Sequence, residues 1–252
     1  MPQYVARLWV DRRPADDDAL ILRQCVDQQT HHVFVDEAVD DRQSAAALAP
    51  AERRRRFVRE AELRAAGNKL GAKTVECFNY PDGELPWTDT TEIENLLSER
   101  IEHWQPQIII TFGADGFYWH PDHIAVHELT KAALSSLQND YVSPSLYYAV
   151  YLEGRMSELA QKLESRGLNF NAWGLKPSAF GVPAADITTR LDVRAFLNAK
   201  LEALNCHRTQ FSKDNTFVSL PPDLAEEFLG REYFIRDVSA NGETDILAEI
   251  VG

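Results

Sequence analysis

Short apolar segments alternate with longer amphipathic segments along most of this chain. The run QIIITF (107–112) is apolar enough for a strand that is buried on both faces. It is followed by DHIAVHELTKAALSSL (122–137), where apolar residues recur at helical spacing, and then by the strand-like SLYYAVYL (145–152). Strands that alternate with long helices predict an α/β fold, with a mostly parallel sheet covered by helices on both faces. Ligands of such folds bind beyond the carboxyl ends of the strands.

The remaining elements follow from the same patterns. Further strands are predicted at 4–10, 31–35, 74–78 and 232–239, and further helices at 49–71, 91–104 and 188–211. Two stretches that contain glycine and proline, 79–90 and 170–187, are predicted to be loops. The 252 residues, 44% hydrophobic and 26% charged, suffice for one domain that spans the whole chain.

The composition excludes several classes of partner. A net charge of −13 disfavours binding to nucleic acid or to an anionic membrane surface, because both would be repelled at long range. The three cysteines (Cys25, Cys77 and Cys206) are far apart and form no C-x-x-C pair, so neither a disulfide framework nor a thiolate zinc site is expected. No signal peptide and no apolar run of about 20 residues is present, which predicts a cytoplasmic protein without a membrane span. Homo-oligomerisation stays open.

Three histidines and two aspartates lie in FGADGFYWHPDHIAVH, directly after the apolar run. Pro121 suits the first turn of a helix, so His120, Asp122 and His123 are expected to project from a junction between strand and helix. Imidazoles and carboxylates are ligands of catalytic zinc, where three protein groups leave a fourth position for water. Asp122 could equally orient the His120 imidazole. The alternative is a polar helix cap without a ligand.

The segment DGFYWHPDHIAVH resembles the second signature of the LmbE/PIG-L family of zinc-dependent de-N-acetylases. Members have a Rossmann-like fold and remove acetyl groups from substrates that contain N-acetylglucosamine. Five further segments match in the same order: REAELRAAGNKLGA, YPDGEL, IIITFGADG, DVRAFLNAKLEALNCHRTQ and EYFIRD. The resemblance covers roughly residues 50 to 237, whereas residues 1–49 diverge.

The resemblance implies a role for each residue of the second signature. His123 corresponds to a zinc ligand, and His120 to the histidine that stabilises or protonates the tetrahedral intermediate, with Asp122 holding it. Tyr118 corresponds to a tyrosine that polarises the substrate carbonyl. The implied cofactor is Zn²⁺, with Fe²⁺ as the alternative.

Two residues outside that signature correspond to positions that contact the sugar. They are Arg59, on the arginine-rich helix, and Asp82, in YPDGEL. Arg59 could instead form a surface ion pair with Glu60 or Glu62, and Asp82 could simply form a turn before glycine.

The first signature of the family, A-H-P-D-D-E, is altered here to RRPADDDALI. Aligning the carboxylates puts Asp16 at the general base, Asp17 at the second metal ligand and Asp18 at the glutamate. Pro14 then stands where the histidine ligand belongs, and proline cannot bind a metal. Asp16 and Asp17 could alternatively cap a helix.

Three explanations of Pro14 remain open. A pseudo-enzyme would have lost tight zinc binding and kept a sugar pocket. Alternatively, His127, His31 or His32 could supply the missing ligand, although His31 and His32 begin a predicted strand and would lie at the opposite end of the sheet. His127 is otherwise expected to be a partly buried helix histidine. Lastly, the segment before about residue 50 could come from a shifted reading frame.

Together these patterns predict a hydrolase that removes acetyl from a small N-acetylated amino-sugar compound. Asp16 would take a proton from the metal-bound water, and Tyr118 and His120 would stabilise the charge on the carbonyl oxygen. Two alternatives are an inactive family member that binds an amino sugar, and an amidase that cleaves a thiol conjugate. A nucleotide-binding protein is disfavoured, because no G-x-G-x-x-G follows the first strand.

Overall fold

The computed structural model describes residues 2–3, 8–9, 50–78, 80–81, 83–137, 144–211, 213, 215–238 and 245–251. Its strands are β1 (Pro2–Gln3), β2 (Leu8–Trp9), β3 (Tyr80–Pro81), β4 (Ile108–Phe112), β5 (Ser145–Val150), β6 (Thr189–Asp192) and β7 (Arg231–Arg236). Its α-helices are α3 (Pro50–Lys69), α4 (Thr90–Trp104), α5 (Gly116–Trp119), α6 (Pro121–Ser135), α7 (Arg155–Glu164), α8 (Leu197–Leu204), α9 (Pro222–Leu229) and α10 (Ile246–Val251). Short 3₁₀ turns are η1 (Leu85–Trp87), η2 (Pro177–Ala179), η3 (Arg194–Phe196) and η4 (Thr216–Val218).

The predicted α/β class is confirmed, but the expectation of a mostly parallel sheet is wrong for the described strands. The five-stranded sheet has the order β2-β4-β5-β7-β6. β4 and β5 are parallel, whereas the other three pairs are antiparallel. For β6 and β7 the reason is their connection, which leaves and returns at the same end of the sheet and sets Asp192 opposite Arg231. Such a connection makes neighbouring strands antiparallel.

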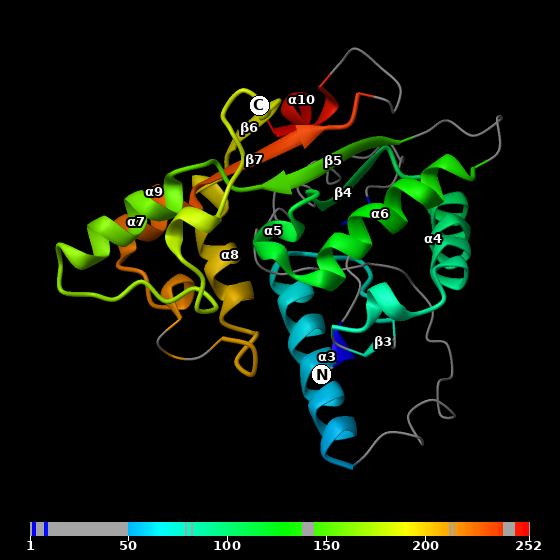
Figure 1. Ribbon diagram of the computed structural model, residues 1–252, viewed down its shortest axis with the longest axis horizontal. Helices are drawn as coiled ribbons and strands as arrows, with labels where there is room; N and C mark the ends of the chain where they lie inside the picture. Colours follow the sequence, from blue (N-terminus) through cyan, green and yellow to red (C-terminus); the bar gives the residue numbers. More distant parts are fainter. Residues whose placement is uncertain are drawn as a thin grey trace.

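Helices cover both faces of this sheet, as predicted (Figure 1). Successive residues of a strand point to opposite faces. Ile109 and Tyr148 therefore belong to the large core that includes residues of α4 and α6, whereas Ile108 and Tyr147 pack with Leu247 of α10. The unit from β4 through α6 to β5 is a parallel strand–helix–strand crossover. The turn at the carboxyl end of β4 therefore leads to the first residues of α6.

Several predicted elements match the structure and others do not. The strands at 107–112, 145–152 and 232–239 and the helices at 49–71, 91–104 and 122–137 are confirmed as β4, β5, β7, α3, α4 and α6. The single helix predicted at 188–211 is wrong, because β6 and η3 precede the shorter α8 there. Segment 74–78 is not a regular strand: only Glu76 lies in a bridge. The predicted strand 31–35 lies outside the described residues.

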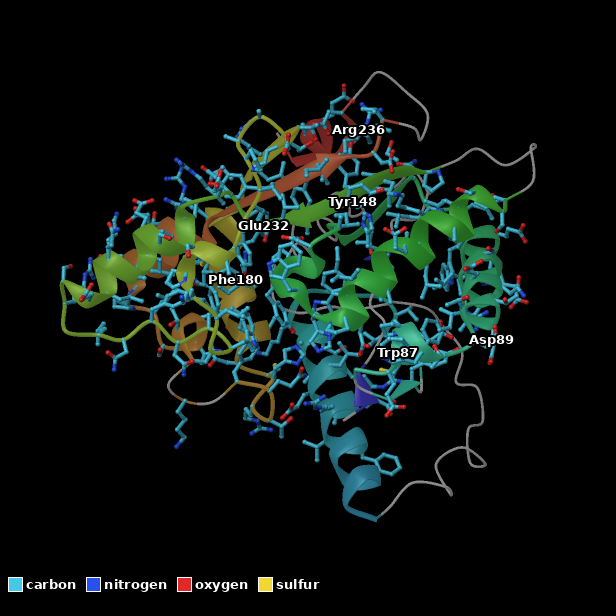
Figure 2. The ribbon with its side chains drawn as sticks, viewed as in Figure 1. Trp87, Asp89, Tyr148, Phe180, Glu232 and Arg236 are labelled. Carbon is cyan, nitrogen blue, oxygen red and sulfur yellow. The ribbon has the colours of Figure 1, made fainter. Side chains whose placement is uncertain are left out.

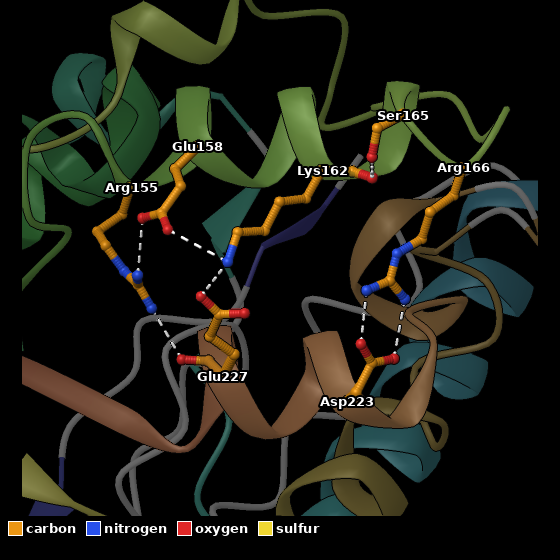
Figure 3. A network of polar contacts seen from close by, with 7 residues as sticks. All are labelled: Arg155, Glu158, Lys162, Ser165, Arg166, Asp223 and Glu227. Carbon is orange, nitrogen blue, oxygen red and sulfur yellow. Dashed lines mark hydrogen bonds and ion pairs between the residues drawn. The ribbon is translucent and has the colours of Figure 1, made fainter.

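Two helices that the sequence did not indicate, α7 and α9, are joined by a polar network on the surface (Figure 3). Lys162 pairs with Glu227 at 2.5 Å, and Arg166 donates two hydrogen bonds to Asp223 at 2.9 and 2.6 Å. The Arg155 guanidinium donates to the Glu227 carbonyl, so both ends of α7 are attached to α9. This network fixes the point from which the long loop 165–187 departs.

A buried ion pair attaches α8 to the beginning of β7. The Lys200 ammonium donates to the Glu232 carboxylate at 2.6 Å and to the Leu229 carbonyl at 3.0 Å. The side chains of Lys200 and Glu232 are only 4% and 0% exposed; Glu232 is labelled in Figure 2. The charge of each group is therefore balanced mainly by protein rather than by water.

None of the helices in the described part of the chain is both long enough and apolar enough to cross a membrane.

Candidate active site

The carboxyl end of β4 continues into an irregular turn that leads to α6. Gly113 has no room for a side chain, because a Cβ atom there would lie 2.9 Å from Val150 Cγ1. Gly116 has φ +56, and a Cβ atom there would lie 2.8 Å from Ile124 Cγ1. Phe117 and Trp119 also have positive φ, 70° and 62°, a conformation that residues with side chains rarely adopt. This crowded turn sets the direction of the side chains that follow.

His123 lies in the first turn of α6 and is buried, with 6% of its surface exposed. Its Nδ1–H donates to the Gly116 carbonyl at 3.0 Å, and its ring stacks on Phe112 at 3.9 Å between centroids. Burial, together with the nearby His120, lowers the pKa of His123 to about 3. The imidazole is therefore neutral at ordinary pH, and Nε2 is the atom that a metal ion would meet.

Tyr118 and His120 lie against His123. The ring centroid of His123 is 5.0 Å from that of Tyr118 and 4.8 Å from that of His120, and the rings of Tyr118 and His120 are 5.7 Å apart. His120 is the N-cap of α6, and its Nδ1 accepts the Asp122 backbone N–H at 3.2 Å. Both Tyr118 and His120 are half-buried, so they remain accessible to a small molecule.

The Asp122 carboxylate binds a different partner from the one predicted. Its two oxygens accept the backbone N–H groups of Gly83, at 2.7 Å, and Leu85, at 3.1 Å. Its contact with His120 is made through its backbone N–H rather than through the carboxylate. Asp122 thus attaches the YPDGEL loop to the start of α6, and it places the residues that flank Asp82 beside the histidine cluster.

The loop 170–187 also reaches this turn. Trp173 stacks on Tyr118 with 4.4 Å between centroids and an interplanar angle of 5°. The indole Nε1–H of Trp119 donates to the Ala179 carbonyl at 3.1 Å. Sequence reasoning predicted the loop but missed Trp173, because no periodic or motif signal shows which residue of an irregular loop meets Tyr118.

A second buried group lies between α3 and the segment after α8. Glu62, which is 4% exposed, accepts hydrogen bonds from the backbone N–H and hydroxyl of Thr209, at 3.0 and 2.6 Å. Glu60 pairs with Arg64 at 2.9 Å. The positive charge of Arg59 helps to lower the pKa of His207, which is 4% exposed. The structure thus places Arg59 beside the segment NCHRTQ.

The environment of His207 predicts a specific loss of stability in acid. Burial and then the positive charge of Arg59 lower the pKa of His207 to about 4, against about 6.5 in an unfolded chain. Between these values the unfolded state binds a proton that the folded state does not, so stability falls as the pH falls. We expect His207 to remove on the order of 3 kcal/mol between pH 6.5 and 4.

Urea unfolding at several pH values measures this effect against His207→Gln. The other acidic and basic groups contribute alike to both proteins, so the difference between the two slopes isolates His207. The variant should lose less stability than the original chain over this range; equal slopes would contradict the assignment.

The described residues supply part of a metal site. His123 is a suitable zinc ligand, because it is neutral and its Nδ1–H is oriented by a backbone carbonyl. However, no group of three His, Cys, Asp or Glu residues that could hold a metal ion occurs in the described ranges. His127 is buried, and its Nδ1–H donates to the Phe112 carbonyl at 2.9 Å. The other predicted residues lie outside the described part: Pro14, Asp16, Asp17, Asp18, His31, His32 and Asp82.

Comparison with known proteins bears on the same region. Residues 16–134, just under half of the chain, match the family model "PIG-L: GlcNAc-PI de-N-acetylase". The chain is 37% identical over 157 residues to a 1D-myo-inositol 2-acetamido-2-deoxy-alpha-D-glucopyranoside deacetylase of Rhodococcus jostii, covering 58% of this chain and 53% of that protein. A protein with the same description from Acidothermus cellulolyticus is 33% identical over 142 residues, covering 55% and 48%.

The chain therefore spans about half the length of the curated relatives that it matches. Among solved structures it is similar to GalB, the 4-carboxy-2-hydroxymuconate hydratase of Pseudomonas putida KT2440, with a TM-score of 0.49 and 16% identity over 81% of this chain and 82% of that one. A similarity of that size supports no argument about function. Residues 16–134, which match the family model of PIG-L de-N-acetylases, contain both Asp16 and the turn with Tyr118, His120 and His123.

Proposed function

We propose that this chain hydrolyses the acetamide of a small molecule that contains N-acetylglucosamine, releasing acetate and a free amine. The observation that carries the proposal is the arrangement of Tyr118, His120 and the neutral, buried His123 at the carboxyl end of β4. Two curated relatives whose matches contain much of the chain are named as deacetylases of an acetamido-glucopyranoside of inositol. An inositol conjugate is therefore the first substrate to test.

We further propose that His123 and Asp17 hold a zinc ion, or alternatively Fe²⁺. When bound, such an ion supplies a water of lowered pKa and polarises the acetamide carbonyl. The donor chemistry of His123 supports this assignment. The third protein ligand is not identified, because Pro14 stands at its expected position.

The side chains have separate tasks in this proposal. Asp16 takes the proton of the attacking water and later returns it to the departing amine. Tyr118 and His120 donate hydrogen bonds to the carbonyl oxygen as negative charge develops on it. Because Nδ1 of His120 accepts the Asp122 N–H, the proton that His120 donates is the one on Nε2. Asp122 acts by holding the loop with Asp82 in place, while Asp82 and Arg59 bind the sugar.

A second candidate function is favoured by Pro14. A family member that lacks one metal ligand would bind the amino sugar without hydrolysing it. The match with the family model begins at Asp16 and continues through residues 16–49. This supports a divergent N-terminal segment over a shifted reading frame, since a shifted frame would not retain the similarity.

Turnover assays separate these functions. The chain is supplied with zinc and is incubated with one substrate in each of three parallel reactions. The substrates are an N-acetylglucosamine–inositol conjugate, methyl N-acetylglucosaminide and an N-acetylated thiol conjugate. Acetate together with free amine from the first two supports the proposal. Cleavage of the thiol conjugate alone would make the chain an amidase of another class, and saturable binding without acetate would make it a binding protein.

A further inference from the structure

Trp119 is an aromatic side chain that the core does not use. It lies directly before His120, yet 60% of its surface is exposed. The residues before and after it are at least half-buried, and His123 is only 6% exposed. The rings of this turn thus become more exposed to solvent in the order His123, then Tyr118 and His120, then Trp119.

The backbone of Trp119 is in a conformation that disfavours any residue with a side chain. Its φ is 62°, and it follows Gly116 and Phe117, which have φ 56° and 70°. The left-handed region suits glycine, so an exposed tryptophan here lowers the stability of the turn rather than raising it. Unfavourable backbone conformations of this kind concentrate at functional sites, which motivates a functional role for the indole.

Although it is exposed, the indole is held in one orientation. Its Nε1–H donates to the Ala179 carbonyl at 3.1 Å. The neighbouring ring, Tyr118, stacks on Trp173 of the same loop at 4.4 Å. Two contacts therefore attach loop 170–187 to consecutive residues of the turn. An aromatic face that is already oriented loses little entropy when a ligand packs on it.

We propose that Trp119 is a binding residue on which a saturated six-membered ring of the substrate stacks by its C–H face. This inference rests on the proposed function, because it places the reacting acetamide at Tyr118 and His120. The part of the substrate next to the acetamide then lies outward, where the indole is exposed. A pyranose and a cyclitol both have an apolar face that suits the electron-rich face of tryptophan. Trp119 thereby contributes to specificity for ring-bearing amides.

The test compares Trp119→Gly and Trp119→Ala. Both remove the indole, but only glycine relieves the left-handed backbone, so Trp119→Gly should unfold at a higher temperature than Trp119→Ala. If the indole binds substrate, both variants should raise KM for the inositol conjugate about tenfold and leave kcat within about twofold. Trp119→Phe keeps an aromatic face but not the N–H, so its KM should lie between that of the original chain and that of the Gly and Ala variants. Trp87→Ala, which removes an even more exposed tryptophan, is the matched control and should not change KM.

Comparing substrates identifies the ring. A KM increase for both methyl N-acetylglucosaminide and the inositol conjugate assigns the contact to the pyranose, and an increase for the conjugate alone assigns it to the cyclitol. Unchanged KM in Trp119→Gly, or a KM increase only in the variant that loses stability, would overturn the inference while the deacetylase function stands.

A binding measurement separates this inference from the proposed function. Indole fluorescence is titrated with methyl N-acetylglucosaminide and the inositol conjugate in the original chain and in Trp119→Gly. If the original chain releases no acetate but shows a saturable change that Trp119→Gly lacks, the function fails and the stacking role stands. If neither ligand changes the fluorescence of the original chain, the stacking role fails as well.

Discussion

Replacing His120 by alanine should lower kcat for acetate release by a factor of about 10² to 10⁴, the usual contribution of a proton donor in the transition state. His120 is half-buried, 4.8 Å from His123 and 5.7 Å from Tyr118 between ring centroids. Its Nδ1 accepts the Asp122 N–H, so the proton that His120 would donate is the one on Nε2. The KM should change little, because the interaction forms only as charge develops on the carbonyl oxygen.

Loss of the helix cap must be separated from loss of chemistry. His120→Ala also removes an N-cap acceptor, which lowers stability by about 1 kcal/mol. His120→Asn restores a cap acceptor but not an imidazole that can transfer a proton, so it should regain stability and stay as inactive as His120→Ala. His103→Ala, which removes an exposed histidine near the end of α4, serves as the matched control. If His120→Asn kept a kcat near that of the original chain, His120 would not be the donor.

Among the substitutions proposed for this chain, replacing the buried cation Lys200 should cause the largest decrease in the free energy of unfolding. In Lys200→Met the Glu232 carboxylate, 0% exposed, loses the ammonium that lies 2.6 Å away. Leaving a buried charge without its counter-ion costs about 3 to 5 kcal/mol. We expect chemical denaturation to show a decrease of that size in the free energy of unfolding, because α8 is attached to β7 through this pair.

Two controls test the cause of that loss. Arg166→Met breaks the bidentate pair with Asp223, in which the Arg166 side chain is 41% exposed and the Asp223 side chain 63% exposed. It should lower the free energy of unfolding by only about 0 to 1 kcal/mol. The double variant Lys200→Met with Glu232→Leu removes both charges and should recover much of the stability. A loss as small in Lys200→Met as in Arg166→Met would contradict the importance of the buried pair.

The centre of the fold and the position of the site could be predicted from the sequence because their signals are local. A continuously apolar run predicts the buried β4, and Pro121 marks the first turn of α6. The sequence predicts candidate ligand-binding residues after β4, and the structure brings three of these candidates together there, Tyr118, His120 and His123. By contrast, the direction of β6 and β7 depends on a connection of 38 residues between Asp192 and Arg231, whose path no local pattern determines.

Side-chain partners that are distant in sequence could not be predicted. Asp122 was expected to orient His120, but its carboxylate binds N–H groups 39 and 37 residues away in the chain. A histidine and an aspartate two residues apart suggest a mutual contact, and only the tertiary packing of η1 against α6 shows the actual partners of the carboxylate. Trp173 likewise reaches Tyr118 through an irregular loop. The positions of Asp16, Asp17 and Asp82 remain predictions.

The proposed function requires that the chain act as a metal-dependent deacetylase in spite of Pro14. Bound zinc and acetate released from the N-acetylglucosamine–inositol conjugate are measured on the same preparations of the original chain and of His123→Ala. We predict one zinc per chain and acetate release in the original chain, and loss of both in His123→Ala. An original chain that binds the conjugate but holds no metal and releases no acetate would contradict the proposed function.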